Sequence, residues 1–516
     1  QKGDRVAAYL PNIPQAVVAL LACAAIGAVW SSCSPDTGAA SVADRFQQIA
    51  PAVLIAVDGY RYAGKNFDRR AVVADLQRKL PTLRHTVLVP YLDPQADASA
   101  LGAIAWDALL AHQGELAFEP VPFDHPLWVL YSSGTTGLPK PIVQGHGGIL
   151  LEHLKSLALH CNLGPQSRFF WFTTTGWMMW NFLVSALLVG STILLFDGSP
   201  GHPDLGALWR FAEQTRATFF GTSAAYVAAC IKADIAPGAS FDLSALQAIG
   251  STGSPLPADG FRWLHERVGQ GIWLVSLSGG TDACTAFVGG CPLLPVYAGE
   301  IQCRFLGAPV AVFNEAGQPL LGEPGELVLT APMPSMPLFF WNDDGGVRYR
   351  ESYFEHYAGV WRHGDWASIT PRGGVIIYGR SDATINRQGI RMGTSEIYRA
   401  VEELPAIADS LVVDLEMLGR PSFMALFVQL APGAALDDAL IATIRATIRA
   451  TLSARHVPDA IYAVPAIPRT LNGKKLELPV KKILLGTPPE RAANPGSLAD
   501  PASLAPFVAL AAKIAR

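Results

Sequence analysis

The chain has 516 residues, and its 39 lysines and arginines stand against 43 aspartates and glutamates. Because 50% of the residues are hydrophobic and only 16% are charged, the composition argues against a mostly disordered protein. The near-neutral charge balance argues against nucleic-acid binding. The most apolar stretches, Ala16–Trp30 and Phe182–Phe196, are shorter than the roughly 20 residues of a membrane-spanning helix. We expect a buried helix preceded by Pro14 in the first stretch, and a change from helix to strand at Gly190 in the second.

The seven cysteines show no Cys-x-x-Cys spacing and no histidine-rich set beside them. A disulfide framework or zinc site is therefore not expected, and we predict buried free thiols in a reducing compartment. No charged-then-apolar signal segment opens the chain, so we expect a cytoplasmic protein. The sequence starts at Gln1, inside what the pattern indicates is an amphipathic unit, and we expect that residues are missing upstream.

Short β-branched runs alternate with helical patterns over the first part of the chain. The predicted buried strands are Ala52–Val57, Thr86–Val89, Leu127–Tyr131, Thr192–Phe196, Ala217–Phe220 and Ile272–Leu277. Helical patterns lie between several of these strands, at Gly148–Leu159, Leu205–Arg216 and Ser223–Ala233. The alternation predicts crossover units, largely parallel sheets and an α/β fold class with flanking helices.

The amino-acid composition of the chain changes after about Glu300. Glycine and proline become frequent there, and the short strands Glu326–Thr330 and Gly374–Tyr378 predict a β-rich subdomain over about 300–380. We therefore expect a large N-terminal domain over 1–380. A small α+β C-terminal domain is expected over 381–485, followed by a linker with a docking helix over 486–516. The elements predicted in this last part are Ser395–Leu404, Ser410–Leu415, Ser422–Leu430, Leu436–Ser453, Ala460–Val464 and Pro501–Ile514.

The strongest chemical signal is the segment Tyr131–Lys140, which follows a predicted strand. Its glycines let backbone N–H groups approach an anion, its serines and threonines add donors, and Lys140 adds a positive charge suited to phosphate. The segment is not a Walker A loop, because only two residues separate Gly134 from Gly137 and Pro141 follows the lysine.

Two further segments point to a nucleotide and its metal ion. Leu277–Asp282 follows a predicted strand, and its two glycines open space for a ligand. Asp282 could hold Mg²⁺, although a turn or capping role is favoured for this aspartate taken alone. Asp365 follows Gly364 in a turn that suits two ribose hydroxyls, a signal that is weak by itself.

The last two segments lie near or beyond the predicted domain boundary. Arg380 and Arg391 are suited to clamping phosphate or ribose, and ordinary surface charge is an equal alternative for each. Lys474 follows the turn signal of Asn472 and Gly473, so it can be delivered into a site built by another domain. The alternative for Lys474 is a solvated lysine.

In their order and spacing, the five segments resemble the acyl-adenylate-forming superfamily, which includes acyl-CoA synthetases, peptide-synthetase adenylation domains and luciferases. The resemblance covers nearly the whole chain. Within the superfamily the chain is most similar to the acetoacetyl-CoA synthetases, on the basis of Thr174–Trp180, Ser278–Asp282 and Thr470–Lys475. Such enzymes usually carry a further N-terminal segment, which supports the expected truncation.

The resemblance implies roles for the matching residues. Lys474 and Thr281 would be catalytic, with Thr281 touching the α-phosphate and the substrate carboxylate. Asp282, where the family usually has Glu, would be the Mg²⁺ ligand. The residues implied to bind the nucleotide are Ser132, Ser133, Gly134, Thr135, Thr136, Gly137, Lys140, Gly253, Ser254, Pro255, Gly280, Asp365, Arg380 and Arg391.

The resemblance also implies a mobile small domain, with Asp382 as the hinge. Gln388 and Gly389 would line the CoA tunnel, and Arg449 would bind the 3′-phosphate of CoA unless it is a solvated charge. Arg61 and Lys65 are weaker candidates for the same phosphate. Acetate-using relatives carry Trp at the position aligned with Gly279, so we expect this glycine to widen the acyl pocket. The candidate pocket walls are Trp177, Met178, Met179 and Trp180, although simple core packing is the somewhat favoured alternative for such a cluster.

These similarities imply a ligase that uses ATP, Mg²⁺ and CoA and forms acetoacetyl-CoA from acetoacetate through acyl-AMP, releasing AMP and pyrophosphate. No covalent protein nucleophile is needed, in keeping with the lack of a Ser/His/Asp arrangement. The alternatives are the same chemistry on another short acid such as 3-hydroxybutyrate, or a non-catalytic nucleotide-binding remnant. A peptide-synthetase adenylation domain is disfavoured, because no carrier module is visible. Only small-molecule partners are expected, and the oligomeric state stays open.

Overall fold

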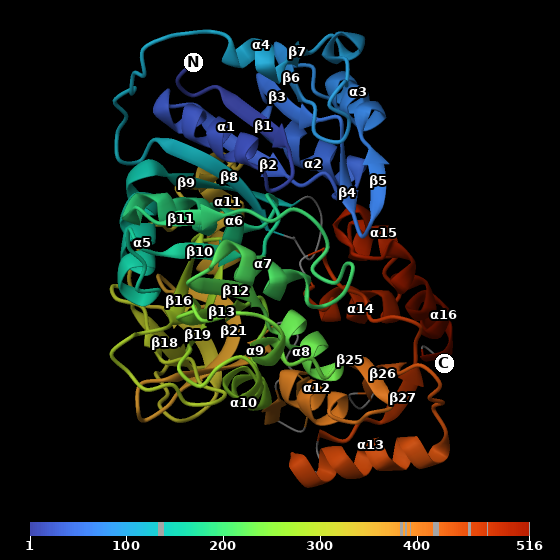
Figure 1. The fold of residues 1–516 in the computed structure, drawn as a ribbon. Helices are drawn as coiled ribbons and strands as arrows, with labels where there is room; N and C mark the ends of the chain where they lie inside the picture. Colours follow the sequence, from blue (N-terminus) through green and yellow to red (C-terminus); the bar gives the residue numbers. More distant parts are fainter. Residues whose placement is uncertain are drawn as a thin grey trace.

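The computed structural model describes residues 1–132, 139–381, 385–387, 390–392, 394–415, 423–452, 456–471 and 473–514. In Figure 1, a large body runs from blue to yellow, and an orange and red C-terminal part lies along one side of it. Among the described residues, no helix has both the length and the apolar character needed to cross a membrane. All seven cysteines are free thiols, and five are buried as predicted, whereas Cys291 and Cys303 are only partly buried.

The N-terminal sheet has eight strands in the order β20-β9-β8-β2-β1-β3-β6-β7. These strands are β1 (Arg5–Tyr9), β2 (Val29–Cys33), β3 (Val53–Val57), β6 (His85–Val89), β7 (Ile104–Ala105), β8 (Pro126–Ser132), β9 (Lys140–Gly145) and β20 (Phe339–Phe340). The strands from β8 to β7 are parallel, whereas β9 and β20 run antiparallel to their neighbours. The connecting helices are α1 (Pro14–Ala25), α2 (Ala39–Ile49) and α3 (Arg70–Lys79). The parallel majority confirms the prediction from strand–helix alternation.

One element of this sheet differs from its prediction. Ala16–Trp30 is not a single buried helix, because α1 ends before Gly27, which turns the chain at a φ of +67°. Trp30 instead lies in β2, every residue of which is buried. The apolar run continues past α1 to Val29 and Trp30 of β2, so hydrophobicity alone did not mark where the helix ends.

A second sheet of five parallel strands has the order β11-β10-β12-β13-β14. The strands are β10 (Arg168–Trp171), β11 (Thr192–Leu194), β12 (Phe219–Ser223), β13 (Ala248–Thr252) and β14 (Trp273–Ser276). The helices of this region are α5 (His146–Lys155), α6 (Met178–Ser185), α7 (Ala207–Thr215), α8 (Ala224–Lys232) and α10 (Ala258–Arg267). The predicted helix-to-strand change in Phe182–Phe196 is confirmed, with Gly190 at a φ of +75° between α6 and β11.

Short strands follow, and those beyond Glu300 lie where the frequent glycines and prolines predicted a β-rich region. They pair in antiparallel fashion. A three-stranded and a four-stranded sheet lie in this region. The strands are β15 (Ser278–Gly280), β16 (Thr285–Gly289), β17 (Cys303–Arg304), β18 (Val310–Phe313), β19 (Gly325–Leu329), β21 (Trp361–Ile369) and β22 (Val375–Arg380). Helix α11 (Val347–Tyr353) packs beside β21.

The C-terminal part is built on the three-stranded sheet β25-β26-β27. Its elements are β23 (Ile385–Arg387), β24 (Ile390–Met392), α12 (Thr394–Glu402), β25 (Ile407–Leu415), β26 (Phe423–Leu430), α13 (Asp438–Thr451), β27 (Ala460–Ala463), α14 (Glu477–Leu484), α15 (Pro489–Ala492) and α16 (Ala505–Ile514). One face of the sheet packs on α12 and α13, and the other on α14 and α16. The predicted helices and strands of this part are confirmed.

The end of the chain packs in two places. Helix α16 docks on the C-terminal sheet, where the ring of Phe507 lies 4.9 Å from that of Phe427. The segment before it reaches the N-terminal body, where the Gly38 N–H donates to the Gly496 carbonyl at 3.2 Å. The remaining short elements are β4 (Gly59–Tyr62), β5 (Lys65–Asp68), α4 (Trp106–Leu110) and α9 (Pro237–Ser240).

Candidate active site

A cavity of about 1150 Å³ lies where the large body meets the C-terminal part. Both parallel sheets, the β15–β16 and β21–β22 pairs, α12 and the turn before α14 contribute to its wall. The cavity therefore brings together segments that are hundreds of residues apart in the sequence. The predicted residues that line it are Ser132, Lys140, Trp177, Gly253, Ser254, Pro255, Gly279, Gly280, Thr281, Asp282, Asp365, Arg380 and Lys474.

Asp282 forms the acidic centre of the cavity. Lys140, at the start of β9, places its Nζ 3.4 Å from Asp282 Oδ1, and Tyr353 at the end of α11 donates its hydroxyl to the same oxygen. The Lys140 ammonium also lies 4.9 Å from the centre of the Tyr353 ring. Burial raises the pKa of Asp282, but the Lys140 charge and the Tyr353 hydrogen bond outweigh it, so that the pKa falls below its usual value. Asp282 is therefore ionised at neutral pH.

The loop that carries Asp282 is held from behind by Gln144. This fully buried side chain donates to the carbonyls of Asp282 at 2.8 Å and Thr281 at 3.2 Å. Its own oxygen accepts from the Trp128 indole at 2.9 Å. Because every polar atom of Gln144 is satisfied, the main chain at Thr281 and Asp282 has a fixed position.

Asp365 lies in a second polar cluster. It pairs directly with Arg380 across β21 and β22, and Arg380 Nη1 is 3.4 Å from Asp365 Oδ1. His363 Nε2 is 3.5 Å from the other oxygen of the same carboxylate. Gly280 leaves room for this imidazole, because an added Cβ would lie 2.6 Å from His363 Cε1. Burial lowers the pKa of His363, so the ring is neutral at pH 7.

Lys474 enters the cavity from the C-terminal part on a tight turn. The Thr470 N–H donates to the Lys474 carbonyl at 2.8 Å, the Lys474 N–H donates to Thr470 Oγ1 at 3.1 Å, and Gly473 supplies a φ of +79°. The Lys474 side chain is exposed to the cavity, and the surrounding cavity walls partly shield it from bulk water. Burial lowers the pKa of Lys474 and the Arg380 charge lowers it further, whereas the Asp365 and Asp282 charges oppose the shift.

The pocket wall agrees with the predictions only in part. Trp177, Met178 and Met179 line the cavity, but Trp180 does not, because its indole donates to Asn12 within the core. Gly279 lines the cavity through its main chain. An added Cβ there would lie 2.1 Å from the Thr285 carbonyl oxygen, so this glycine is needed for the close approach of β15 to β16. Gly279 lines the cavity as predicted, and its effect on the width of the acyl pocket stays a prediction.

Some predicted residues are not brought to the cavity or lie outside the described part. Arg449 is exposed on α13 and does not line the cavity. Arg61 donates to Asn66 at 2.9 Å, and Lys65 is exposed on β5. The predicted residues outside the described part are Ser133, Gly134, Thr135, Thr136, Gly137, Asp382, Gln388 and Gly389, and for Arg391 only the main chain is described.

Sequence reasoning missed three residues of this site. Tyr353 and Gln144 carry no local signal, because their contacts with Asp282 join distant segments. His363 stood inside a segment chosen for Asp365, and a histidine two residues from a ribose-binding candidate was the available hint.

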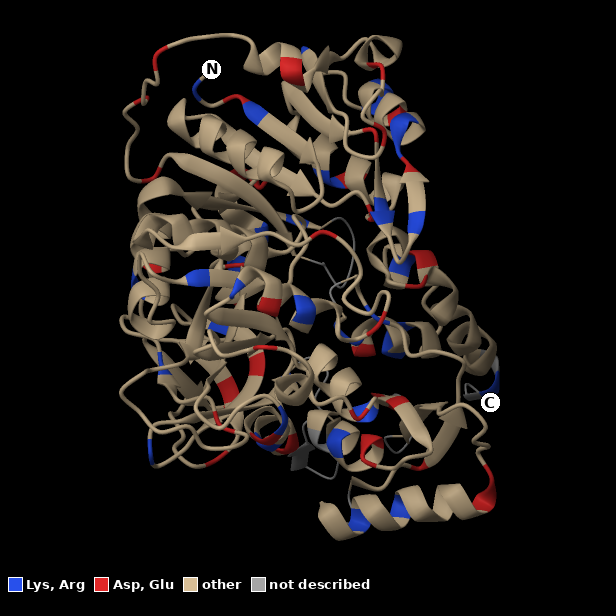
Figure 2. Ribbon diagram, in the orientation of Figure 1, with Lys and Arg blue, Asp and Glu red and all other residues tan. Residues whose placement is uncertain are grey.

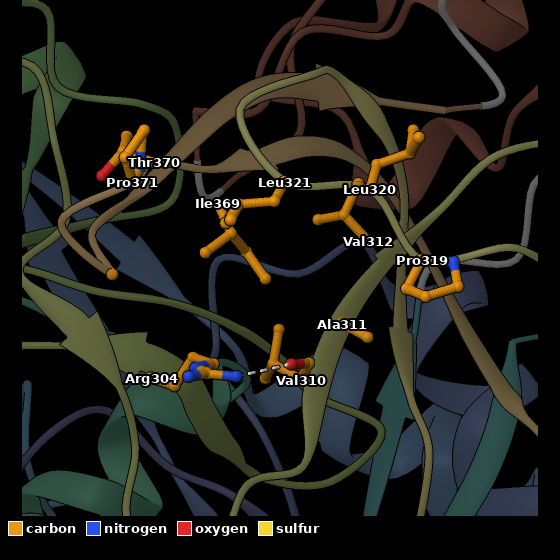
Figure 3. A pocket seen from close by; sticks show the side chains of 11 residues that line it. Arg304, Val310, Ala311, Val312, Pro319, Leu320, Leu321, Ile369, Thr370 and Pro371 are labelled. Atoms are coloured by element: carbon orange, nitrogen blue, oxygen red, sulfur yellow. Dashed lines mark hydrogen bonds between the residues drawn. The ribbon is translucent and has the colours of Figure 1, made fainter.

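A smaller cavity of about 360 Å³ lies between the β18 and β21 ends (Figure 3). Its wall is mostly aliphatic, with Val310, Val312, Leu320 and Ile369 around it. Its one charged lining residue, Arg304, donates to the Val310 carbonyl at 3.4 Å. None of the predicted site residues lines it.

The chain was compared with known proteins. A family model described as "AMP-binding enzyme" matches residues 1–336. The acetoacetyl-coenzyme A synthetase of Rhizobium meliloti (strain 1021) is 47% identical over 515 residues, which cover 98% of this chain and 78% of that protein. The acetoacetyl-CoA synthetase of Gallus gallus is 42% identical, with 97% of this chain and 76% of that protein covered.

Two solved structures are also similar. The acetoacetyl-CoA synthetase from Streptomyces lividans is 58% identical, with a TM-score of 0.94 over 99% of this chain and 78% of that one. An anthranilate CoA ligase in complex with anthranoyl-AMP is 19% identical, with a TM-score of 0.78 over 92% of this chain and 86% of that one. At that identity, the second likeness concerns the fold alone.

Proposed function

Because the chain belongs to the AMP-binding enzyme family and, within it, to the acetoacetyl-CoA synthetases, we propose that it joins acetoacetate to CoA at the expense of ATP. The reaction passes through acyl-AMP and releases AMP and pyrophosphate. One observation carries the proposal. Lys474 of the C-terminal part lines the same cavity as Lys140, Asp282, Asp365 and Arg380 of the large body.

In the first half-reaction, a carboxylate oxygen of the acid attacks the α-phosphorus of ATP. The bond from that phosphorus to the bridging oxygen breaks, and pyrophosphate leaves with the electron pair. Negative charge accumulates on the phosphoryl oxygens, so fixed cations stabilise the transition state more than the ground state. We assign this role to Lys474, with Lys140 and Arg380 beside it, and we assign to Thr281 the contact with the carboxylate.

The nucleoside is held at the other polar cluster. Asp365 accepts hydrogen bonds from the ribose hydroxyls, and His363 and Arg380 keep its carboxylate in place. Gly253, Ser254 and Pro255 line the cavity after β13, where the φ of +90° at Gly253 turns the chain. We assign adenine contact to this loop.

Asp282 suits Mg²⁺ only as a single carboxylate that shares the ion with the phosphates of the substrate. The described residues hold no group of three or more His, Cys, Asp or Glu side chains able to bind a metal ion. Mg²⁺ commonly takes one or two carboxylates together with substrate phosphates, and Asp282 is an ionised carboxylate on the cavity wall. When bound there, the ion neutralises phosphate charge.

In the second half-reaction, the CoA thiol attacks the acyl carbonyl, the thioester forms and AMP leaves. Lys474 occupies the cavity in this structure, so we propose that the small domain (381–485) rotates on the large one (1–380) between the two steps. Asp382 is the proposed hinge. After the rotation, Gln388 and Gly389 would line the CoA tunnel and Arg449 would meet the 3′-phosphate.

The identity of the acid substrate depends mainly on the names of the similar proteins. The relatives at 42–47% identity bear the name of acetoacetyl-CoA synthetase. Trp177, Met178 and Met179 line the cavity together with Gly279, and we propose that these four residues set the size of the acid that fits. 3-Hydroxybutyrate and acetate are the informative comparisons.

The test is a product analysis. The protein is incubated with ATP, Mg²⁺ and acetoacetate, with and without CoA, and AMP, ADP and thioester are quantified by liquid chromatography. We expect CoA-dependent AMP and acetoacetyl-CoA in equal amounts, and less product from acetate or 3-hydroxybutyrate. Formation of ADP, or ATP binding without any AMP, would contradict the proposed function.

A further inference from the structure

Two adjacent lysines of the C-terminal turn differ in their surroundings. Lys474 lines the cavity with its side chain open to it. Lys475 also lines the cavity, but its charge is held within the C-terminal part, where its Nζ lies 2.5 Å from Glu402 Oε1 and 3.0 Å from Asp409 Oδ1. The same ammonium lies 3.7 Å from the centre of the Tyr398 ring. Only 12% of the Lys475 side chain is exposed, so its charge is compensated by protein rather than by water.

Asp409 also binds the other end of the turn. Arg469 Nε donates to Asp409 Oδ2 and Arg469 Nη2 donates to Asp409 Oδ1, both at 2.9 Å. The third nitrogen of this guanidinium donates to the carbonyl of Gly473, at the tip of the turn. A bidentate arginine–carboxylate pair fixes direction as well as distance. One carboxylate at the start of β25 therefore holds the residues that flank Lys474 on both sides.

The four charges of this network balance, with two cations (Arg469 and Lys475) and two anions (Asp409 and Glu402). Acidic and basic residues also lie side by side where the C-terminal part faces the large body in Figure 2. Although burial raises the pKa of Asp409, Lys475 and Arg469 lower it to about 2. Removing one carboxylate would leave two cations with only Glu402 to compensate them.

Main-chain contacts anchor the turn independently of the network. The Leu471 N–H donates to the Ser497 carbonyl at 3.1 Å, and the Ala499 N–H donates to the Arg469 carbonyl at 2.9 Å. These bonds do not involve the Asp409 carboxylate. If that carboxylate is lost, we expect the Lys474 side chain to be less well oriented, while the main chain of the turn stays in place.

We propose that Asp409, through Arg469 and Lys475, is a positioning residue that aims Lys474 at the reacting phosphate during adenylation. The inference rests on the proposed function, because it requires that Lys474 acts in the first half-reaction. Asp409 also lines the cavity, but both of its carboxylate oxygens pair with Arg469 or Lys475, so we assign it no contact with the nucleotide or the acid. Its effect is therefore confined to the half-reaction that uses Lys474, and a misplacement of about 1 Å in such a group can cost on the order of 100-fold in rate.

The test separates the two half-reactions in the full chain. Adenylation is measured as acetoacetate-dependent exchange between ATP and pyrophosphate, and thioester formation is measured from supplied acyl-AMP and CoA. For Asp409→Asn we expect exchange to fall about 10- to 100-fold in kcat, with the KM for ATP changed less than about twofold. Thioester formation should stay within about twofold of wild type. Asp409→Glu should recover part of the exchange rate, because it restores the charge.

Two further variants keep the test decisive. Lys475→Gln removes a cation that pairs with Asp409. If Asp409→Asn is poorly folded, Lys475→Gln should still show slower exchange with unchanged thioester formation. Asp75→Asn is the matched control, because Asp75 also pairs with two cations, Arg78 at 3.0 Å and Lys79 at 2.8 Å, on the exposed helix α3. It should change neither half-reaction.

The outcomes are distinguishable. Equal loss of both half-reactions, or no loss of either, in Asp409→Asn and Lys475→Gln would overturn this inference alone. A Lys474→Ala protein that keeps full exchange would overturn the assigned role of Lys474, and the positioning role with it. Wild-type protein without acid-dependent exchange would overturn the proposed function itself.

Discussion

At the residue scale, one oxygen of Asp282 meets both a phenol and an ammonium. Tyr353 donates to it from α11, and Lys140 lies 3.4 Å away on β9. The Tyr353 ring also stacks on Trp361, with the ring centres 3.6 Å apart. The aspartate is shorter than the glutamate common in the family, and these two donors determine where its carboxylate lies.

Removing only the phenol oxygen tests that arrangement. In Tyr353→Phe the ring keeps its stack on Trp361, but Asp282 loses a hydrogen bond worth about 1 kcal/mol. We expect the Mg²⁺ concentration for half-maximal AMP formation to rise about threefold to tenfold. Calorimetry of Mg²⁺-ATP binding should show the same loss. Tyr349→Phe is the control, because that hydroxyl donates to the Pro337 carbonyl instead. Equal effects in the two variants would contradict the role of Tyr353.

A buried histidine makes stability depend on pH. His153 lies between the Ser185 hydroxyl and the Cys284 carbonyl, each at 2.7 Å, and burial lowers its pKa from 6.5 to about 4. The unfolded chain therefore binds a proton at a higher pH than the folded chain does. The stabilisation is complete above pH 6.5 and is lost as the pH falls toward 4.

Calorimetric melting at pH 7, 5.5 and 4.5 measures this dependence. We expect the Tm of the wild type to fall over that range, and the fall to be shallower for His153→Gln, which keeps a donor for the Cys284 carbonyl. Identical slopes for the two proteins would show that other groups control the acid sensitivity.

At the element scale, α8 of the large body touches β25 of the C-terminal part. Lys232, the last residue of α8, donates to the Ala408 carbonyl and lies 3.5 Å from the Ile407 carbonyl. These carbonyls immediately precede Asp409. The contact exists in the orientation in which Lys474 lines the cavity, so it favours that orientation over the rotated one.

Lys232→Ala should therefore act on one half-reaction. We expect pyrophosphate exchange to fall about twofold to fivefold, since one charged hydrogen bond is lost at an exposed site, and thioester formation from acyl-AMP to be unchanged or faster. Lys79→Ala, which removes an exposed ion pair with Asp75, serves as control. A slower thioester step in Lys232→Ala would contradict this assignment.

Elements with a strong local pattern were predictable, and their boundaries moved by a few residues. The strand before Lys140 was expected over Leu127–Tyr131 and spans Pro126–Ser132. The helix predicted in Ala16–Trp30 is present as α1 but ends at Ala25, because the apolar run continues into the buried strand β2. For Gly279, the sequence did not show that an added side chain would meet β16, because only the register of β15 on β16 gives that direction.

At the scale of the whole molecule, the cavity is a product of tertiary structure. The sequence motifs identified Lys140, Asp282, Asp365 and Lys474. No pattern in the sequence predicts that these residues line one cavity. Contacts between distant segments, such as Tyr353 with Asp282, have no local signature. The family resemblance predicted the cavity residues because it carries three-dimensional information that periodicity and spacing do not.

The central claim is that Lys474 serves adenylation and then gives way to CoA. The most direct measurement compares wild type with Lys474→Ala in the two separate half-reactions. We expect ATP–pyrophosphate exchange to fall at least about 100-fold in the variant, because a cation is lost at the reacting phosphate. Thioester formation from supplied acyl-AMP should continue at the wild-type rate. Equal loss of both half-reactions, or undiminished exchange, would contradict this claim.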